Sequence, residues 1–173
     1  ENTTAERYSI TLNLDFASVS FRPSVNYTSL QNYVYFDSLG LPQQYGDPIQ
    51  ILQLGLQTEL RWRKYRAKLD FLYTANSATN IMRMPDFQIT GQIYRDGKLF
   101  RSQRTTQVGL DFHYKSAYLG DAFMPATQQF YLQNEFEVEN YLNIDLFFNL
   151  QIKSFLLFLK VNNLTENLIG QGY

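Results

Sequence analysis

Cysteine is absent from the 173-residue sequence, and neither sign of charge is in clear excess. Without cysteine the chain has neither a disulfide framework nor a thiolate metal site. Fifteen Lys and Arg against sixteen Asp and Glu give a net charge of −1, which excludes the basic footprint typical of nucleic-acid binding. We therefore expect no nucleic-acid partner.

Long apolar stretches are also missing, since no continuous run approaches the roughly 18 residues that a transmembrane helix needs. The mean hydropathy of −0.32 is that of a soluble protein. It does not exclude a transmembrane barrel, because half of each barrel strand is polar. Aromatic residues make up 16% of the chain, with 13 Tyr and 14 Phe, and this abundance favours an all-β class.

Residues 51–74 show the clearest pattern, an alternation with a period of two in two arms of roughly 11 to 14 residues. The arms meet at Arg63 and Lys64, which predicts a hairpin with a tight turn. One face is apolar and aromatic and the other is charged. Arms of this length exceed the usual strand of about 5–6 residues and suit a tilted strand that crosses a bilayer.

The same alternation recurs along the chain. Further strands are predicted at residues 7–16, 20–36, 87–94, 107–115, 142–151 and 155–162. Asp96 and Gly97 predict a two-residue hairpin turn that requires positive φ. Residues 33–36 are aromatic and fit either an interfacial girdle or simple β propensity. Residues 127–139 could add strands to the barrel or form a β extension above the membrane.

The predicted connections alternate in length. Short ones are expected near residue 18 and at 63–64, 96–97 and 153–154. Long ones are expected at 37–48, 75–85 and 116–141 and from 164 onward. Alternation of faces alone would also suit a soluble sandwich, but alternating loop lengths favour an antiparallel transmembrane β-barrel, of which this chain supplies about eight strands. We assign residues 1–173 to a single outer-membrane barrel domain.

In a transmembrane barrel, one face of the sheet lines the aqueous lumen and the other meets lipid. Charged and amide side chains are expected to line a polar lumen: Arg22, Gln53, Gln57, Glu59, Arg61, Arg66, Lys68, Asp70, Asp111, His113, Lys115 and Asp145. Apolar side chains are expected to face lipid: Leu52, Leu54, Leu56, Leu60, Trp62, Leu69, Phe71, Tyr73, Val108, Leu110, Phe112, Leu146 and Phe148. The sequence stops at residues 170–173 without a strand that closes the sheet, so we expect further strands from the same polypeptide or from a partner, since an open edge in lipid is costly.

Several segments together carry a family resemblance. They begin at residues 32–36 (NYVYF) and 41–44 (LPQQ), and include 83–85 (RMP), Leu99-Phe100 and Gly109. The most specific are residues 118–134 (YLGDAFMPATQQFYLQN) and 140–148 (NYLNIDLFF). These segments resemble the putative porin family of Bacteroidetes outer membranes, and the resemblance implies a β-barrel of the Gram-negative cell outer membrane. The family tends to have Pro after the Tyr where this chain has Leu142, and the closing aromatic segment of the family is absent. Residues 161–164 (VNNL) also resemble the penultimate strand of TonB-dependent receptors.

Residues that could carry chemistry are few. His113 shares a face with Asp111 and Lys115, which could form an Asp-His pair, but no nucleophile motif or oxyanion loop accompanies them. Glu135, Glu137 and Glu139 share a face and could hold a hard cation, although no ligand loop with a glycine turn surrounds them. We therefore expect no enzyme activity, no cofactor and no metal site, and interpret these residues as lumen lining and solvated loop.

Two function classes remain open. A pore would let small solutes pass through a polar lumen of mixed charge. A non-conducting barrel, or a component like a TonB-dependent receptor, would serve a larger outer-membrane uptake or secretion complex. The expected partners are outer-membrane lipid, the remaining strands of the same polypeptide and other outer-membrane proteins.

Overall fold

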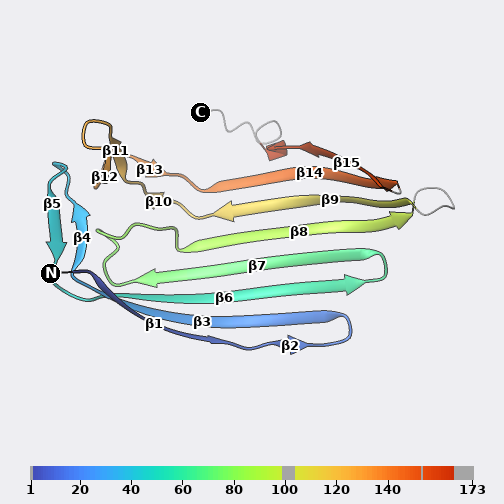
Figure 1. The fold of residues 1–173 in the computed structure, drawn as a ribbon, viewed down its shortest axis with the longest axis horizontal. Helices are drawn as coiled ribbons and strands as arrows, with labels where there is room; N and C mark the ends of the chain where they lie inside the picture. The colour runs from blue at the N-terminus through green and yellow to red at the C-terminus, as the bar shows by residue number, and fades with distance from the viewer. Residues whose placement is uncertain (1, 99–103, 153, 166–173) are drawn as a thin grey trace.

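The computed structural model describes residues 2–98, 104–152 and 154–165, and nearly all of this chain lies in β-strands and their connections. Long strands run side by side across the molecule (Figure 1). They are β1 (Thr4–Thr11), β3 (Val19–Gln31), β6 (Ile49–Trp62), β7 (Tyr65–Asn76), β8 (Phe87–Lys98), β9 (Arg104–Lys115), β14 (Tyr141–Ile152) and β15 (Phe155–Val161). The chain is therefore all-β, as the sequence predicts.

These strands form one antiparallel sheet in the order β1-β3-β6-β7-β8-β9-β14-β15, with the short β2 (Leu14–Asp15) also paired to β3. Each long strand pairs with the one before it and the one after it among the long strands, so the sheet is a meander. The strand predicted at 7–16 is divided here into β1 and β2. The predicted antiparallel arrangement is confirmed.

The hairpin of β6 and β7 shows why the alternation produces this sheet. Leu56 lies opposite Phe71, and Gln57 lies opposite Asp70, so apolar residues pair with apolar ones and polar residues with polar ones. The turn falls at residues 63–64 as predicted, and Arg63 takes a left-handed conformation there, with a φ of 53°. Period-two patterning thus fixes both the strands and their register.

The two ends of the sheet differ in the length of the connections that they carry (Figure 1). One end has the tight turns at residues 16–18 and 63–64, whereas the other has the long connections 32–48, 77–86 and 116–140. The alternation of short and long connections is therefore present in the described chain. The connections predicted at 153–154 and from 164 onward lie partly outside the described residues.

The predicted turn at Asp96 and Gly97 is wrong. Both residues belong to β8, where Asp96 pairs with Gln107 and Gly97 pairs with Thr106. Gly97 does not have positive φ, as a primed turn would require. The Gln107 side chain donates to Asp96 Oδ1 at 3.0 Å. This bond supports the pairing of β8 with β9 at the residues where the sequence predicts a turn.

The strand predicted at 20–36 is two strands. β3 ends at Gln31, and Asn32 takes a φ of 56°, a conformation that asparagine tolerates better than most residues. β4 (Tyr33–Phe36) then pairs with β5 (Pro42–Tyr45) in a separate hairpin, so residues 37–48 are not all loop. The aromatic residues 33–36 lie in this hairpin, and their contact with a membrane interface stays a prediction.

Residues 116–140 form a β extension, so residues 127–139 add no strand to the main sheet. That this extension stands above the membrane stays a prediction. β10 (Tyr118–Leu119) pairs with β13 (Glu137–Val138), and β11 (Ala122–Met124) pairs with β12 (Gln129–Tyr131). None of these strands joins the main sheet. They gather at the end that carries the long connections (Figure 1).

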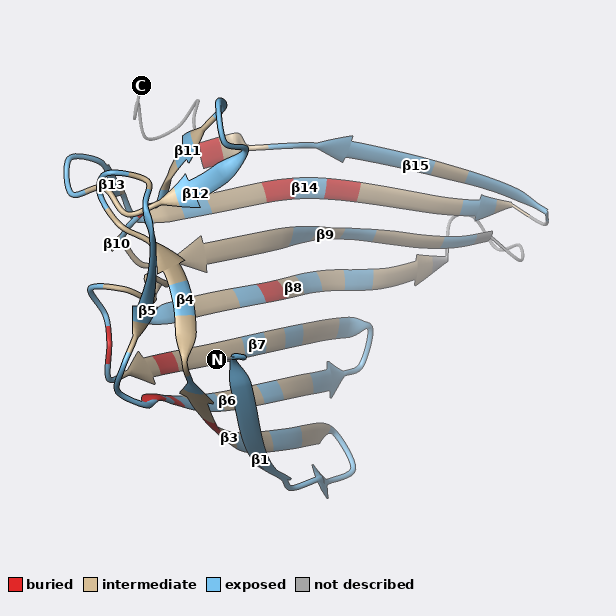
Figure 2. Cartoon of the chain, turned by 60° about the vertical axis from the view of Figure 1, so that its left-hand side comes forward, coloured by how far each residue is buried: buried red, intermediate tan, exposed pale blue. Residues whose placement is uncertain are grey.

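Few of the described residues are buried (Figure 2). Among the described residues, the buried apolar ones are Ile49, Ile51, Ala78 and Phe147. The first three form a small cluster near the long connections, against which Leu30, Tyr33, Tyr45 and Met82 pack. No helix in the described ranges is long and apolar enough to span a membrane. Within those ranges, the main sheet therefore has no extended apolar core.

Candidate functional site

The register places every predicted lumen residue on one face of the sheet, which we call the polar face. Arg22 pairs with Gln57, Gln57 with Asp70, and Glu59 with Lys68. Across the next strands, Lys68 pairs with Gln92, Gln92 with Asp111 and Asp111 with Asp145. Gln53, Arg61, Arg66, His113 and Lys115 follow from the same alternation along β6, β7 and β9. That this face lines a lumen stays a prediction.

The predicted lipid-facing residues all lie on the opposite, apolar face. Leu54 pairs with Tyr73, Leu56 with Phe71, Leu110 with Leu146 and Val108 with Phe148. The other residues of the set occupy the same face by alternation: Leu52, Leu60, Trp62, Leu69 and Phe112. One layer of backbone thus separates two kinds of side chain. That the apolar face meets lipid also stays a prediction.

Burial differs between the faces in the opposite sense to a soluble sheet. On the apolar face, Leu54 is 39% exposed and Leu110 is 42% exposed. On the polar face, Thr74 and Asp145 are only 2% and 8% exposed. No described element covers the apolar side of the sheet, so these large apolar side chains stay exposed within the described chain.

A network of charged side chains crosses three strands on the polar face. Lys160 Nζ lies 3.3 Å from Asp111 Oδ2 and 2.9 Å from Asp145 Oδ2. Gln92 donates to Asp111 at 2.8 Å, and Asn143 donates to Asp145 at 3.0 Å. Asp111 and Asp145 are direct cross-strand partners, so Lys160 compensates two like charges that would otherwise oppose each other.

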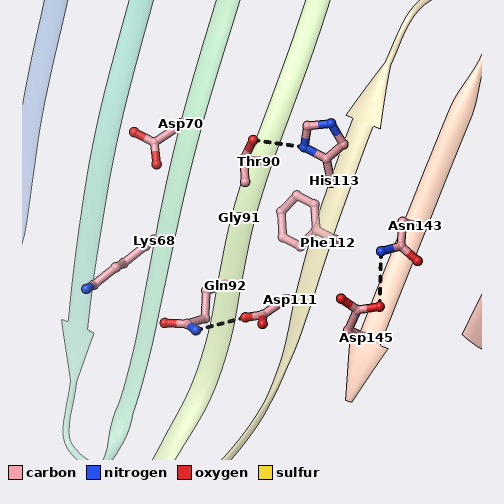
Figure 3. Close-up of a pocket in the computed structure, with 10 residues that line it drawn as sticks. All are labelled: Lys68, Asp70, Thr90, Gly91, Gln92, Asp111, Phe112, His113, Asn143 and Asp145. Atoms are coloured by element: carbon pink, nitrogen blue, oxygen red, sulfur yellow. Dashed lines mark hydrogen bonds between the residues drawn. The ribbon is translucent and has the colours of Figure 1, made fainter. Parts of the chain in front are cut away.

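The same region contains a hollow of about 350 Å³ (Figure 3). Eight of its lining residues belong to the polar face of β7, β8, β9 and β14: Lys68, Asp70, Thr90, Gln92, Asp111, His113, Asn143 and Asp145. Gly91 and Phe112, which alternate with them along β8 and β9, complete the lining. Thr90 Oγ1 and His113 Nδ1 are 3.2 Å apart. The hollow therefore offers carboxylate, ammonium, imidazole and amide groups to a solute.

The Asp-His pair considered from the sequence is not formed. His113 bonds to Thr90, whereas Asp111 bonds to Lys160. The glutamates of residues 135–139 belong to no candidate ion site, because the described ranges contain no group of three or more His, Cys, Asp or Glu side chains that could hold a metal. The interpretation of these residues as lining and loop stays a prediction.

An aromatic contact on the polar face was not predicted from the sequence. The rings of Tyr94 and Phe147 lie 6.3 Å apart, with Gly109 paired to both residues on the strand between them. A Cβ on Gly109 would come within 2.5 Å of Tyr94 Cβ, so only glycine allows this approach. A glycine opposite an aromatic residue on each neighbouring strand was the available signal.

The sequence also gives no prediction that Lys160 belongs to the polar face. Lys160 is the only charged residue of β15, where both faces carry apolar side chains. Leu156 and Phe158 share the polar face with it and are 54% and 66% exposed. A strand that is apolar on both faces gives no alternation, so the sequence could not assign its inward residues.

Comparisons with known proteins agree with this architecture. A solved structure of the FrpB iron transporter from Neisseria meningitidis (F3-3 variant) superposes with a TM-score of 0.66 at 15% sequence identity. The match covers 93% of this chain and 27% of the transporter, so the chain spans about a quarter of that protein's length. At this identity the likeness shows the fold alone, that of part of a β-barrel. Among curated proteins, no significant match was found.

The family comparison covers almost the whole chain. The family model described as "Putative porin" matches residues 2–173. Porin and transporter families of this kind are typically not enzymatic, and their place is the outer membrane. The chain belongs to this porin family and forms part of a porin-like outer-membrane β-barrel.

Proposed function

We propose that the polar face lines a pore through which small hydrophilic solutes cross the outer membrane of a Gram-negative bacterium, with Bacteroidetes as the source that the sequence resemblance favours. The observation that carries this proposal is the separation of the two faces. Water is the solvent that charged and amide side chains require, and lipid is the solvent that suits exposed Leu and Phe.

The charges of the polar face bear on which solutes pass. Cations and anions are interleaved, as in the contact of Arg61 with Glu59 at 2.9 Å and of Arg66 with Asp96 at 3.8 Å. Paired charges present little net field to a passing ion. The proposed pore therefore favours neutral or weakly selected solutes over one sign of ion.

Conductance of the purified full-length protein in a planar bilayer tests the proposal. We expect stepwise channel openings whose cation-to-anion permeability ratio stays within about threefold of unity, because the lining charges are mixed. A Lys68→Glu variant replaces one lining cation without touching the apolar face, and it should shift the ratio towards cations. A full-length barrel that inserts but conducts no ions would overturn the pore.

A second candidate is a barrel with a filled lumen that serves an uptake or secretion complex together with other outer-membrane proteins. Leu156 and Phe158 support it, because exposed apolar side chains on the polar face suit a protein cover better than water. In this case the purified barrel would insert without conducting.

In both cases we propose that further strands of the same polypeptide continue the sheet beyond β1 and β15, since unpaired strand edges are costly in lipid.

A further inference from the structure

The three long connections lie at the same end of the sheet (Figure 2). We call residues 32–48, 77–86 and 116–140 together the loop cap. Leu132 N, just after β12, donates to Phe36 O of β4 at 3.0 Å. At the tip of the β4–β5 hairpin, a Cβ on Gly40 would lie 2.8 Å from Met124 Cε of β11. The first and third connections are therefore packed directly together.

The tip of the same hairpin is held by a carboxylate. Asp37 Oδ1 accepts hydrogen bonds from the backbone N–H groups of Leu39 and Leu41, each at 2.9 Å. The bond from Leu41, followed by those from Leu39 and the Gln43 side chain, lowers the pKa of Asp37 from its usual value. The carboxylate is therefore charged at neutral pH and keeps the hairpin tip in its packed shape.

Arg83 joins the second connection to the third. Its guanidinium donates to the backbone oxygen of Gln133 and, at 2.6 Å, to Asn134 Oδ1. It also donates to Asn80 O at 3.3 Å, and its side chain is only 5% exposed. A buried guanidinium that donates to several oxygens is a strong, directional crosslink, because the planar group cannot satisfy them from another position.

Asp121 is a lesser partner of Arg83. Its carboxylate lies 3.9 Å from the guanidinium and is 39% exposed. Desolvation raises the pKa of Asp121, and the nearby Arg83 offsets only part of that rise. The neutral oxygens of residues 133 and 134 therefore provide most of the attachment.

The second connection lies over the polar face rather than beside the sheet. Ile49 and Ile51 alternate with the residues of the apolar face on β6 and so point to the polar face, where they cluster with Ala78 and Met82 packs against them. The side chain of Asn76 donates to Met82 O at 3.2 Å and holds the connection in this inward fold. Ala78 itself is 6% exposed.

We propose that Arg83 locks the loop cap over the long-loop end of the polar face and thereby sets the largest solute that can enter the pore. This inference rests on the proposed pore for its functional half. Its structural half, the lock, stands on the contacts of Arg83 alone. Removal of the guanidinium leaves the oxygens of Gln133 and Asn134 without their donor and frees residues 77–86 from residues 116–140.

Cysteine accessibility tests the lock, and the lack of native cysteine makes labelling specific within these residues. Ala78→Cys places a thiol on the buried side of the cap, and the adjacent Thr79→Cys places one on its exposed side. With Arg83→Ala, we expect an impermeant maleimide to label position 78 about 10- to 100-fold faster, the ratio that lost charged hydrogen bonds provide. Labelling at 79 should stay unchanged, and so should labelling at 78 with Lys64→Ala, a control that removes a cation at the opposite end.

Swelling of liposomes that contain the full-length protein tests the entrance. With Arg83→Ala, sugars of increasing size should enter at rates that fall off less steeply than with wild type, whereas Lys64→Ala should match wild type. Heat-modifiable gel mobility checks that each variant is folded. If Arg83→Ala does not fold, Asn134→Ala removes one acceptor of the lock and should increase labelling at 78 by a smaller factor.

The two readouts separate the possible failures. Unchanged labelling at 78 in Arg83→Ala overturns the lock, whether or not the wild type conducts. Faster labelling without swelling in either protein supports the lock and overturns the pore. Faster labelling with an unchanged size profile in a conducting protein means that the cap does not limit entry, and overturns the functional half of the inference.

Discussion

The apolar and polar faces of the sheet are built from alternate residues of the same strands, yet their side chains differ in the contacts that they make. On the polar face, side chains bond to each other across strands, as Lys160 does with Asp111 and Asp145. On the apolar face, Leu110 and Leu146 lie opposite each other, are 42% and 40% exposed, and have no covering element among the described residues. A soluble sandwich would bury this face against a second sheet. This exposure of the apolar face is what the proposed contact with lipid would cover.

The largest expected effect comes from a charge placed on the wrong face. Leu56 and Gln57 are neighbours near the middle of β6, on the apolar and polar faces respectively. Leu56→Arg should destabilise the barrel by about 2–4 kcal/mol if that level lies at the bilayer midplane. Gln57→Arg, between Arg22 and Asp70 on the polar face, should change stability by less than about 0.5 kcal/mol.

Urea unfolding of the full-length protein in lipid vesicles, scored by heat-modifiable gel mobility, measures both variants. Equal losses for Leu56→Arg and Gln57→Arg would mean that the polar face is packed rather than wet. A wild type that stays monodisperse and folded without detergent would contradict the assignment of lipid to the apolar face.

A smaller effect is expected from crowding on the polar face. Gly109→Ala would place a methyl group within 2.5 Å of Tyr94 Cβ and 2.4 Å of Ile93 O, which should cost about 1–3 kcal/mol. Gly46→Ala is the control, since nothing lies within 4 Å of the place that its methyl group would take. The same unfolding measurement applies. A Gly109→Ala barrel as stable as wild type would show that β8 can move away from residue 109 at no cost.

The smallest effect concerns the charge network. Lys160→Met leaves Asp111 opposite Asp145 without a cation between them, and should cost about 0.5–1.5 kcal/mol, because the groups are partly exposed. Asp111→Asn in the Lys160→Met background should recover most of this loss. Lys68→Met is the matched control on the same face. If the double variant is no more stable than Lys160→Met, repulsion between the carboxylates is not the cause.

The strands, their antiparallel pairing and the two faces could be predicted from the sequence because each depends on local alternation. Leu54 and Gln53 are neighbours whose side chains lie on opposite sides of the backbone. A period of two in the sequence assigns each side chain to its face without any tertiary information. The same logic could not place Lys160 or Phe158, because β15 is apolar on both faces.

Local signals failed where cross-strand contacts outweighed them. Asp96 and Gly97 form a strong turn dipeptide, yet their pairing with Gln107 and Thr106 extends β8 through them. The loop cap was beyond prediction for another reason. Arg83 meets residues 133 and 134 across 50 or more residues of sequence, and no pattern within residues 77–86 specifies a partner at that separation.

The meander has a consequence for how such a wall can change in evolution. Because each long strand bonds only to its sequence neighbours among the long strands, the hairpin of β6 and β7 could be duplicated or deleted while β3 and β8 keep strands to pair with. Barrel diameter grows roughly linearly with strand number. Duplication or deletion of a gene segment that encodes one hairpin would therefore add or remove two strands of the barrel wall. The diameter of the barrel can thus increase or decrease in steps while the existing strands stay unchanged.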